Sequence, residues 1–90
     1  MTGQDRGRPI TAMRNLGPAT AGMLAEIEIF TEDDLHGIGA ADAYRRLKFR
    51  FGRHVSLNAL WAMHAALIGC DWRALDDATR QKLRRDAGID

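Results

Sequence analysis

The sequence predicts a single all-α domain. Residue types that start and end helices recur along the 90 residues, and runs of alternating β-formers are nearly absent. Alanine-rich helix starts follow two glycine-centred turns. A chain of this length holds one hydrophobic core, so we expect one compact domain of five or six short helices.

The N-terminal residues predict a tail and two helices. Residues 1–9 are rich in glycine and charge without an apolar face, so we expect a flexible N-terminal tail, followed by one domain over residues 10–87. A short helix is predicted over residues 11–15, with Thr11 as its N-cap. Gly17 and Pro18 end it, and a second helix is predicted from Pro18 to about Ile27 because proline suits the first helical turn.

The middle of the chain predicts two helices joined by glycine. Residues 26–31 predict a turn-like connector rather than a strand. Thr31 and Asp34 have the spacing of an N-cap and an N3 acid, which predicts a short helix from Glu32 to near His36. Residues 37–39 interrupt it, and the next helix is predicted over residues 40–49. Its inward face is expected to hold Ala43, Tyr44 and Leu47, and its outward face Arg45, Arg46 and Lys48.

The C-terminal half predicts two more helices. Ser56 is expected to cap a helix over residues 57–68, and Gly69 to end it in the left-handed conformation. Asn58 and His64 are the polar side chains of that helix, which is typical of a helix buried on several sides. It is either the central core helix or partly a subunit interface. Self-association would then involve Trp61, Met63 and Trp72.

The last helix is predicted over residues 77–87. Asp76 is its expected N-cap, and Gly88 follows its end. Residues expected to pack against the core are Ala78, Leu83 and Ala87.

The two glycine turns resemble each other. Residues 16–21 align with residues 38–43, each with an apolar residue, a glycine and a small-residue helix start. This pattern is typical of helix-hairpin-helix units, in which the amides of the following helix can receive a phosphate. Arg14 lies near the first turn, where Pro18 removes one amide donor, and acidic residues surround Gly39 in the second. The alternative is that both turns are purely structural.

Charge is separated along the chain although its net value is +1. Residues 32–42 carry four acids and no lysine or arginine, and residues 43–54 carry five bases and no acid. The basic segment 45–54 also contains Phe49 and Phe51, so it could combine phosphate attraction with base stacking. An acidic protein would suit the same segment, and the alternative is that both phenylalanines anchor a loop in the core. Candidate contact residues are Arg14, Gly17, Gly39, Arg45, Arg46, Lys48, Arg50 and Arg53.

Several functional classes are disfavoured. No catalytic set or nucleotide-binding loop stands out, and the one cysteine, Cys70, has no zinc-ligand spacing around it. We therefore expect no enzyme activity, no cofactor, no metal and no small-molecule substrate. No apolar stretch approaches the roughly 20 residues that span a bilayer, and no secretory signal is evident, so a cytoplasmic protein without membrane contact is expected.

An ordered set of motifs resembles the C-terminal domain of the TfoX/Sxy family over about residues 10–87. These motifs are Met13–Ala21, Met23–Leu24, Ile29–Thr31, Asp34–Leu35, Ile38–Ala40, Ala43–Leu47, Val55–Asn58, Leu67–Gly69 and Trp72–Arg73. The resemblance implies a helical fold with helix-hairpin-helix (SAM-like) turns and a link to the regulation of natural competence, the uptake of DNA in transformation. We therefore expect a regulatory module that acts through a protein partner or as a homodimer. The alternative is direct nucleic-acid binding through the turns and the basic segment.

Overall fold

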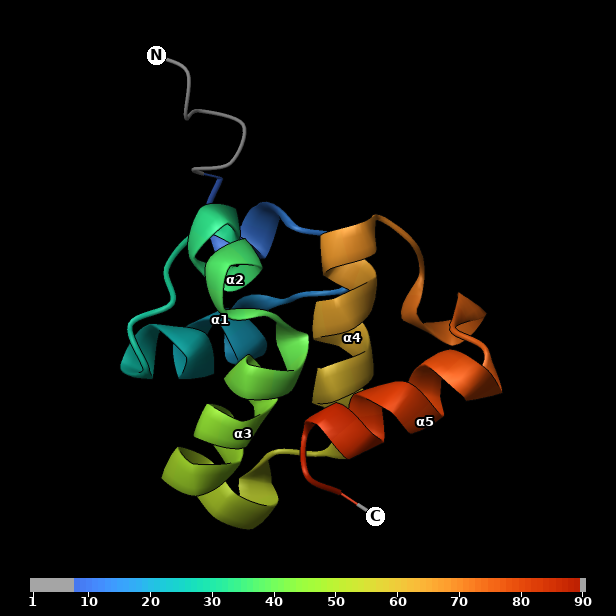
Figure 1. Cartoon of the computed structure of the whole chain (residues 1–90). Coiled ribbons are helices and arrows are strands. Elements are labelled where there is room, and N and C mark those ends of the chain that lie inside the picture. Colours follow the sequence, from blue (N-terminus) through green and yellow to red (C-terminus); the bar gives the residue numbers. More distant parts are fainter. Residues whose placement is uncertain (1–7, 90) are drawn as a thin grey trace.

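A computed structural model describes residues 8–89, which fold into helices around one core (Figure 1). The α-helices are α1 (Pro18–Glu26), α2 (Glu32–Ile38), α3 (Ala40–Phe51), α4 (Leu57–Ile68) and α5 (Asp77–Asp86). Single turns of 3-10 helix occur at η1 (Ile10–Ala12), η2 (Gly52–His54) and η3 (Trp72–Ala74). Extended pairing within the described residues is limited to one antiparallel bridge between Pro9 and Thr31. The predicted all-α fold class is confirmed.

The N-terminal segment differs from the prediction. Residues 1–7 of the predicted tail lie outside the described residues, whereas Arg8 is bonded to the start of α2: its carbonyl accepts from the Glu32 amide at 2.8 Å. The predicted helix over residues 11–15 is wrong, because only η1 forms and Thr11 is not its cap. Ile10 and Met13 are both buried, and the backbone is extended at Met13. Packing of both side chains into the core therefore keeps this segment more extended than a helix.

Helix α2 begins with the predicted cap and ends later than predicted. The Thr31 hydroxyl accepts from the Asp34 amide at 3.2 Å, and the Asp34 carboxylate accepts from the Thr31 amide at 3.2 Å. This is a reciprocal capping box. The helix passes through Gly37 to Ile38 and is separated from α3 by one residue, Gly39.

Helix α4 lies at the centre of the fold, between α3 and η3 (Figure 1). Its bounds are those predicted, and Gly69 ends it in the left-handed region, with φ +77° and ψ +33°. Ser56 occupies the N-cap position, but its side chain makes no capping hydrogen bond, so that part of the prediction is wrong. Five of its side chains are buried: Leu60, Trp61, Met63, Ala65 and Ala66.

Helix α5 closes the core against α3. The Asp76 carboxylate caps it by accepting from the Thr79 amide at 2.8 Å, as predicted. Leu83 and Ala87 are buried, but Ala78 is exposed, so its predicted place in the core is wrong. Ala78 precedes Leu83 by five residues, which turns it about 140° around the helix, away from the buried face. No helix among residues 8–89 is both long and apolar enough to cross a membrane.

Candidate interaction surface on helix α3

The outward face of α3 presents an aromatic ring to solvent. Ala43, Tyr44 and Leu47 are buried against the core, as predicted. Phe49 lies on the opposite side of the helix and is 95% exposed. The alternative in which both phenylalanines anchor the core is therefore wrong for Phe49, while Phe51 is half-buried and packs against the core. Residues 8–89 therefore leave the Phe49 ring almost entirely unpacked.

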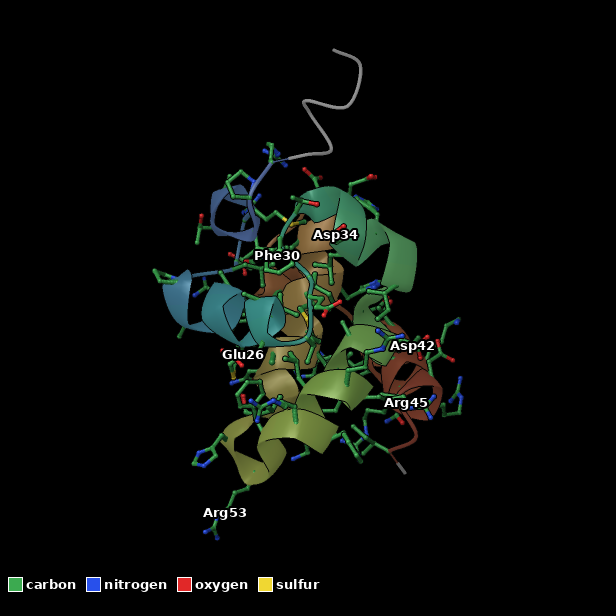
Figure 2. The ribbon with its side chains drawn as sticks, turned by 90° about the vertical axis from the view of Figure 1, so that its left-hand side faces the viewer. Glu26, Phe30, Asp34, Asp42, Arg45 and Arg53 are labelled. Atoms are coloured by element: carbon green, nitrogen blue, oxygen red, sulfur yellow. The ribbon has the colours of Figure 1, made fainter. Side chains whose placement is uncertain are left out.

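Arginines surround that ring. We call the following set the Phe49 face: Arg45, Arg46, Phe49, Arg50 and Arg53. Arg45 and Arg46 precede Phe49 by four and three residues and so lie on the same side of α3, whereas Arg50 is turned about 100° around the helix and Arg53 lies in η2, beyond the end of α3. All five side chains are exposed, and Figure 2 shows Arg53 extending from one end of the molecule. The exposed side chains of the predicted basic segment therefore extend along α3 and past its end.

Two of the arginines have acidic neighbours on the surface. Arg45 approaches Asp42 at 3.7 Å, and Arg50 binds the Glu26 carboxylate of α1 at 3.2 Å. All four side chains are more than half exposed, so these pairs contribute little to stability and can exchange for other partners. The Arg50 guanidinium also lies 5.2 Å from the centre of the Phe51 ring.

The other cations of the segment differ in availability. Lys48 donates to the Val55 carbonyl at 3.3 Å, which joins α3 to the start of α4. Arg46 and Arg53 form no hydrogen bond or ion pair with any of residues 8–89. A shallow groove of about 800 Å³ runs along this side of α3, with Ile27 and Ile89 among its apolar lining. Phe49 and the unpaired Arg46 line this groove and are exposed, so they can contact an external group, whereas Arg53 lies outside the groove.

The Gly39 turn has the backbone geometry of a position that requires glycine. Its φ is +86° and its ψ is +156°, a combination that side chains disfavour. Residues 39–42 line a hollow of about 500 Å³, where Lys82 is paired with Asp86 at 2.9 Å and Asp42 adds a further negative charge. Phosphate binding at Gly39 stays a prediction, and these carboxylates oppose it.

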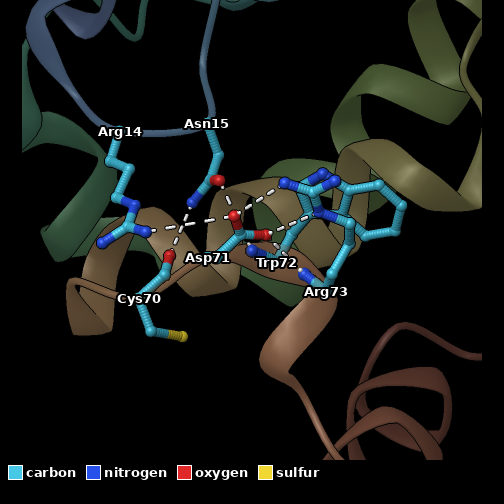
Figure 3. Close-up of polar contacts among 6 residues, drawn as sticks. All are labelled: Arg14, Asn15, Cys70, Asp71, Trp72 and Arg73. Carbon is cyan, nitrogen blue, oxygen red and sulfur yellow. Dashed lines mark hydrogen bonds and ion pairs between the residues drawn. The ribbon is translucent and has the colours of Figure 1, made fainter.

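The Gly17 turn is built differently, so the two turns are not structural repeats. Gly17 has φ −105°, and the positive φ, +73°, falls on Asn15 instead. The Asn15 amide donates to the Cys70 carbonyl at 2.7 Å, and its side-chain oxygen accepts from the Trp72 amide at 3.4 Å (Figure 3). Asn15 therefore fastens the start of α1 to the loop after α4, a role that sequence spacing alone did not reveal.

We predict that Asn15→Ala lowers the free energy of unfolding by about 2 kcal/mol, because it removes both hydrogen bonds and leaves a side chain at positive φ. Asn15→Gly is the matched control, since it loses the bonds but accepts the backbone angle, and about 1 kcal/mol is expected. Urea unfolding followed by circular dichroism measures both values. Wild-type stability in Asn15→Ala would contradict the assigned role.

Arg14 does not join the Phe49 face. It lies 3.9 Å from the Asp71 carboxylate, beside η3 (Figure 3). Arg73 binds the same carboxylate through its backbone amide at 2.9 Å and its guanidinium at 3.1 and 3.0 Å. Hydrogen bonding by Arg73 lowers the pKa of the Asp71 carboxyl to about 2. This cluster is a local clamp on the loop between α4 and α5.

The Asp71 clamp predicts a pH effect. Because the folded pKa of about 2 is below the unfolded value of about 3.9, ionised Asp71 contributes stability above about pH 4 and loses it as the pH falls toward 2. Asp71→Asn should therefore be less stable than wild type at pH 7, with the difference shrinking between pH 4 and pH 2. Unfolding free energies measured across that range test this. A difference that is constant with pH would refute it.

The residues predicted for self-association are mostly internal. Met63 is fully buried within the single chain, so its predicted place on an association surface is wrong. Trp61 is 6% exposed, and Arg80 covers its ring at 5.6 Å. Trp72 is half-buried beside Asn15. Self-association itself stays a prediction, but these side chains offer little surface for it.

Residues 8–89 contain neither a cluster of metal ligands nor a disulfide. Among residues 8–89 no three His, Cys, Asp or Glu side chains gather as metal ligands would. Cys70 is half-buried and free.

Comparison with known proteins gives a family and a fold. No curated protein matches. A crystal structure of an uncharacterized protein from Listeria monocytogenes is similar with a TM-score of 0.79 and 25% identity, over 84% of this chain and 85% of that one. The sequence model of the TfoX C-terminal domain family matches residues 7–87, which is nearly the whole sequence. This confirms the resemblance drawn from the motifs: the chain belongs to the TfoX C-terminal domain family.

Proposed function

We propose that this chain is a non-enzymatic protein-interaction module of a competence-type regulatory system, and that the Phe49 face binds an acidic surface on a partner protein. Membership in the TfoX C-terminal domain family supports the link to competence. The observation that carries the proposal is the 95% exposure of Phe49 among four arginines. Aromatic and arginine side chains are the types that dominate binding energy at protein interfaces.

Charge distribution favours an acidic protein over nucleic acid. Asp42 and Glu26 border the face and would repel phosphates and carboxylates alike. A phosphate backbone carries a charge at every nucleotide, whereas a protein can place carboxylates opposite the arginines and basic groups opposite Asp42 and Glu26. Arg46 and Arg53 are the cations of the face that need not exchange an existing ion pair. A surface with so few unpaired cations gains little from counterion release.

The proposal is tested by replacing Phe49 with serine at the gene's own locus and measuring natural transformation frequency. We expect Phe49→Ser to match a deletion of the gene, with unchanged protein abundance, because the ring is not used in folding. Ile68→Ser is the matched control, since Ile68 is a 57% exposed apolar residue at the end of α4. Wild-type transformation in Phe49→Ser cells would overturn the role of the face. Wild-type transformation in the deletion would overturn the link to competence.

Nucleic-acid binding is the second candidate, favoured by the same exposed ring, because an unpacked aromatic next to arginines can stack a base. Neutralisation of two or three phosphates would make log affinity for duplex DNA fall with log salt at a slope of about −2 to −3. Fluorescence anisotropy with single- and double-stranded oligonucleotides at about 50 mM salt measures this. Binding that Phe49→Ser abolishes would favour nucleic acid, and no binding by wild type would remove this candidate.

A further inference from the structure

Apolar side chains from three segments line the groove beside the Phe49 face. Ile27 follows the end of α1, Phe49 lies in α3, and Ala87 and Ile89 follow the end of α5. Helices α1 and α5 both pack on α3 (Figure 1). We call this groove the α3 groove. Its volume of about 800 Å³ is within the range of about 300–1,000 Å³ that is typical of ligand sites.

Positive charge outweighs negative charge along the α3 groove. The cations that line it are Arg45, Arg46, Lys48 and Arg50, and the described acid that lines it is Asp42. The first and last of these cations have exposed acidic partners, whereas Arg46 and Lys48 have no acidic partner among residues 8–89. The groove therefore favours a ligand that carries both carboxylates and apolar groups.

The α3 groove also contains a hydroxyl group without a partner. Tyr44 lines the groove and is 4% exposed, and its hydroxyl forms no hydrogen bond with any of residues 8–89. Polar groups of buried side chains are rarely left unbonded, because desolvation without a hydrogen bond is unfavourable. Burial raises the pKa of this hydroxyl, although the Arg84 charge opposes the rise, so the group stays protonated at neutral pH. It can therefore donate a hydrogen bond to a ligand carboxylate.

The groups that line the groove are ordered around α3 with Phe49 in the middle. At about 100° per residue, Tyr44 and Lys48 lie on one side of Phe49. Arg46 and Arg50 lie on its other side. The first side faces α5, where a charge acts on the Tyr44 hydroxyl, and the second faces α1, where Arg50 has its ion pair. A hydrogen-bond donor, an aromatic ring and further cations therefore follow one another across α3.

We propose that the α3 groove binds a short acidic segment of the partner protein in which two carboxylates flank an apolar side chain. This inference rests on the proposed function and names the part of the partner that the site binds. One carboxylate would accept from the Tyr44 hydroxyl, the apolar side chain would cover the Phe49 ring, and the second carboxylate would pair with Arg46. An extended segment presents alternate side chains to one surface, and five residues span about 13 Å, close to the width of a helix.

NMR titration of the isotope-labelled chain with a designed pentapeptide tests this contact. The probe is an acetylated and amidated peptide with glutamate at its first and last positions, leucine at its centre and alanine between them. We expect saturable shifts of the amide signals of Ile27, Tyr44 and Ile89 at peptide concentrations up to about 1 mM. The same peptide with glutamine in place of glutamate should bind about tenfold more weakly, because it carries no charge. No saturable shift with the glutamate peptide, or equal binding of both peptides, would overturn the inference.

Two groove variants and one matched control locate the contact. Tyr44→Phe keeps the buried ring and removes the hydroxyl, and Arg46→Gln removes an exposed charge, so both should fold. Each should weaken binding of the glutamate peptide about fivefold or more. Arg53→Gln is the control, because Arg53 is also exposed and unpaired but lies outside the groove, and it should change the affinity by less than about twofold. Wild-type affinity in Tyr44→Phe, or equal losses in both arginine variants, would contradict the proposed contact.

The outcome is separable from that of the proposed function. If the peptide does not bind but Phe49→Ser still abolishes transformation, the inference about the groove fails and the proposed function of the Phe49 face stands. If the peptide binds but Phe49→Ser cells transform like wild type, the groove binds acidic segments and the proposed function fails. A single-stranded oligonucleotide that shifts the same signals at lower concentrations than the peptide would overturn the inference in favour of nucleic acid.

Discussion

Leu60→Ala is expected to lower the free energy of unfolding by about 2–5 kcal/mol, the range for emptying a well-packed leucine site. Leu60 lies at 0% exposure in the central helix α4, where neighbouring helices leave little room for the cavity to collapse. A domain of this size has only about 5–10 kcal/mol of total stability, so the variant should be close to unfolding at 37 °C. Urea unfolding at 25 °C gives the value.

Phe49→Ala is the comparison that makes this result informative. It removes a larger side chain, yet we expect a change below about 0.5 kcal/mol because the ring is 95% exposed. A loss of 2 kcal/mol or more in Phe49→Ala would show that the ring packs in the folded protein. Such a result would contradict its assignment to an interaction surface.

Gly39→Ala is expected to destabilise the domain by about 1–3 kcal/mol. Gly39 has φ +86° and ψ +156°, and it is the single residue between α2 and α3. An added methyl group at this position would meet no atom within 4 Å, so the cost is that of the backbone conformation alone. Thermal and urea unfolding both report the loss.

Gly37→Ala is the matched control for that variant. Gly37 lies two residues earlier, inside α2, is exposed, and also has open space at its missing methyl group. Alanine is the better helix former, so this variant should gain about 0.5–1 kcal/mol. Opposite signs at the two glycines are the expected result. Equal effects would mean that the turn at Gly39 does not require its positive φ.

The helices were predictable where local chemistry defines their ends. The capping box of Thr31 and Asp34, the Asp76 cap and the left-handed Gly69 depend on residues within four positions of each other. The error at residues 11–15 has a tertiary cause, because burial of Ile10 and Met13 overrides a local helix signal.

The candidate surface was predictable in part. The spacing of the arginines identified the basic segment, and helical periodicity could also have placed Phe49 opposite Leu47. Hydrophobicity favours burial, however, and it does not indicate which apolar side chains stay at the surface of a folded protein. Asn15 could not be assigned from sequence, because its partners lie 55 and 57 residues away.

Photo-crosslinking from position 49 tests the central claim most directly, that the Phe49 face binds a protein. Phe49 is replaced in cells by a benzoyl-substituted phenylalanine, which keeps the aromatic ring, and position 68 carries the same group as a control. Irradiation should give a discrete protein adduct from position 49 that is absent from position 68. A crosslink exclusively to nucleic acid, equal adducts from both positions, or no adduct from position 49 would contradict the claim.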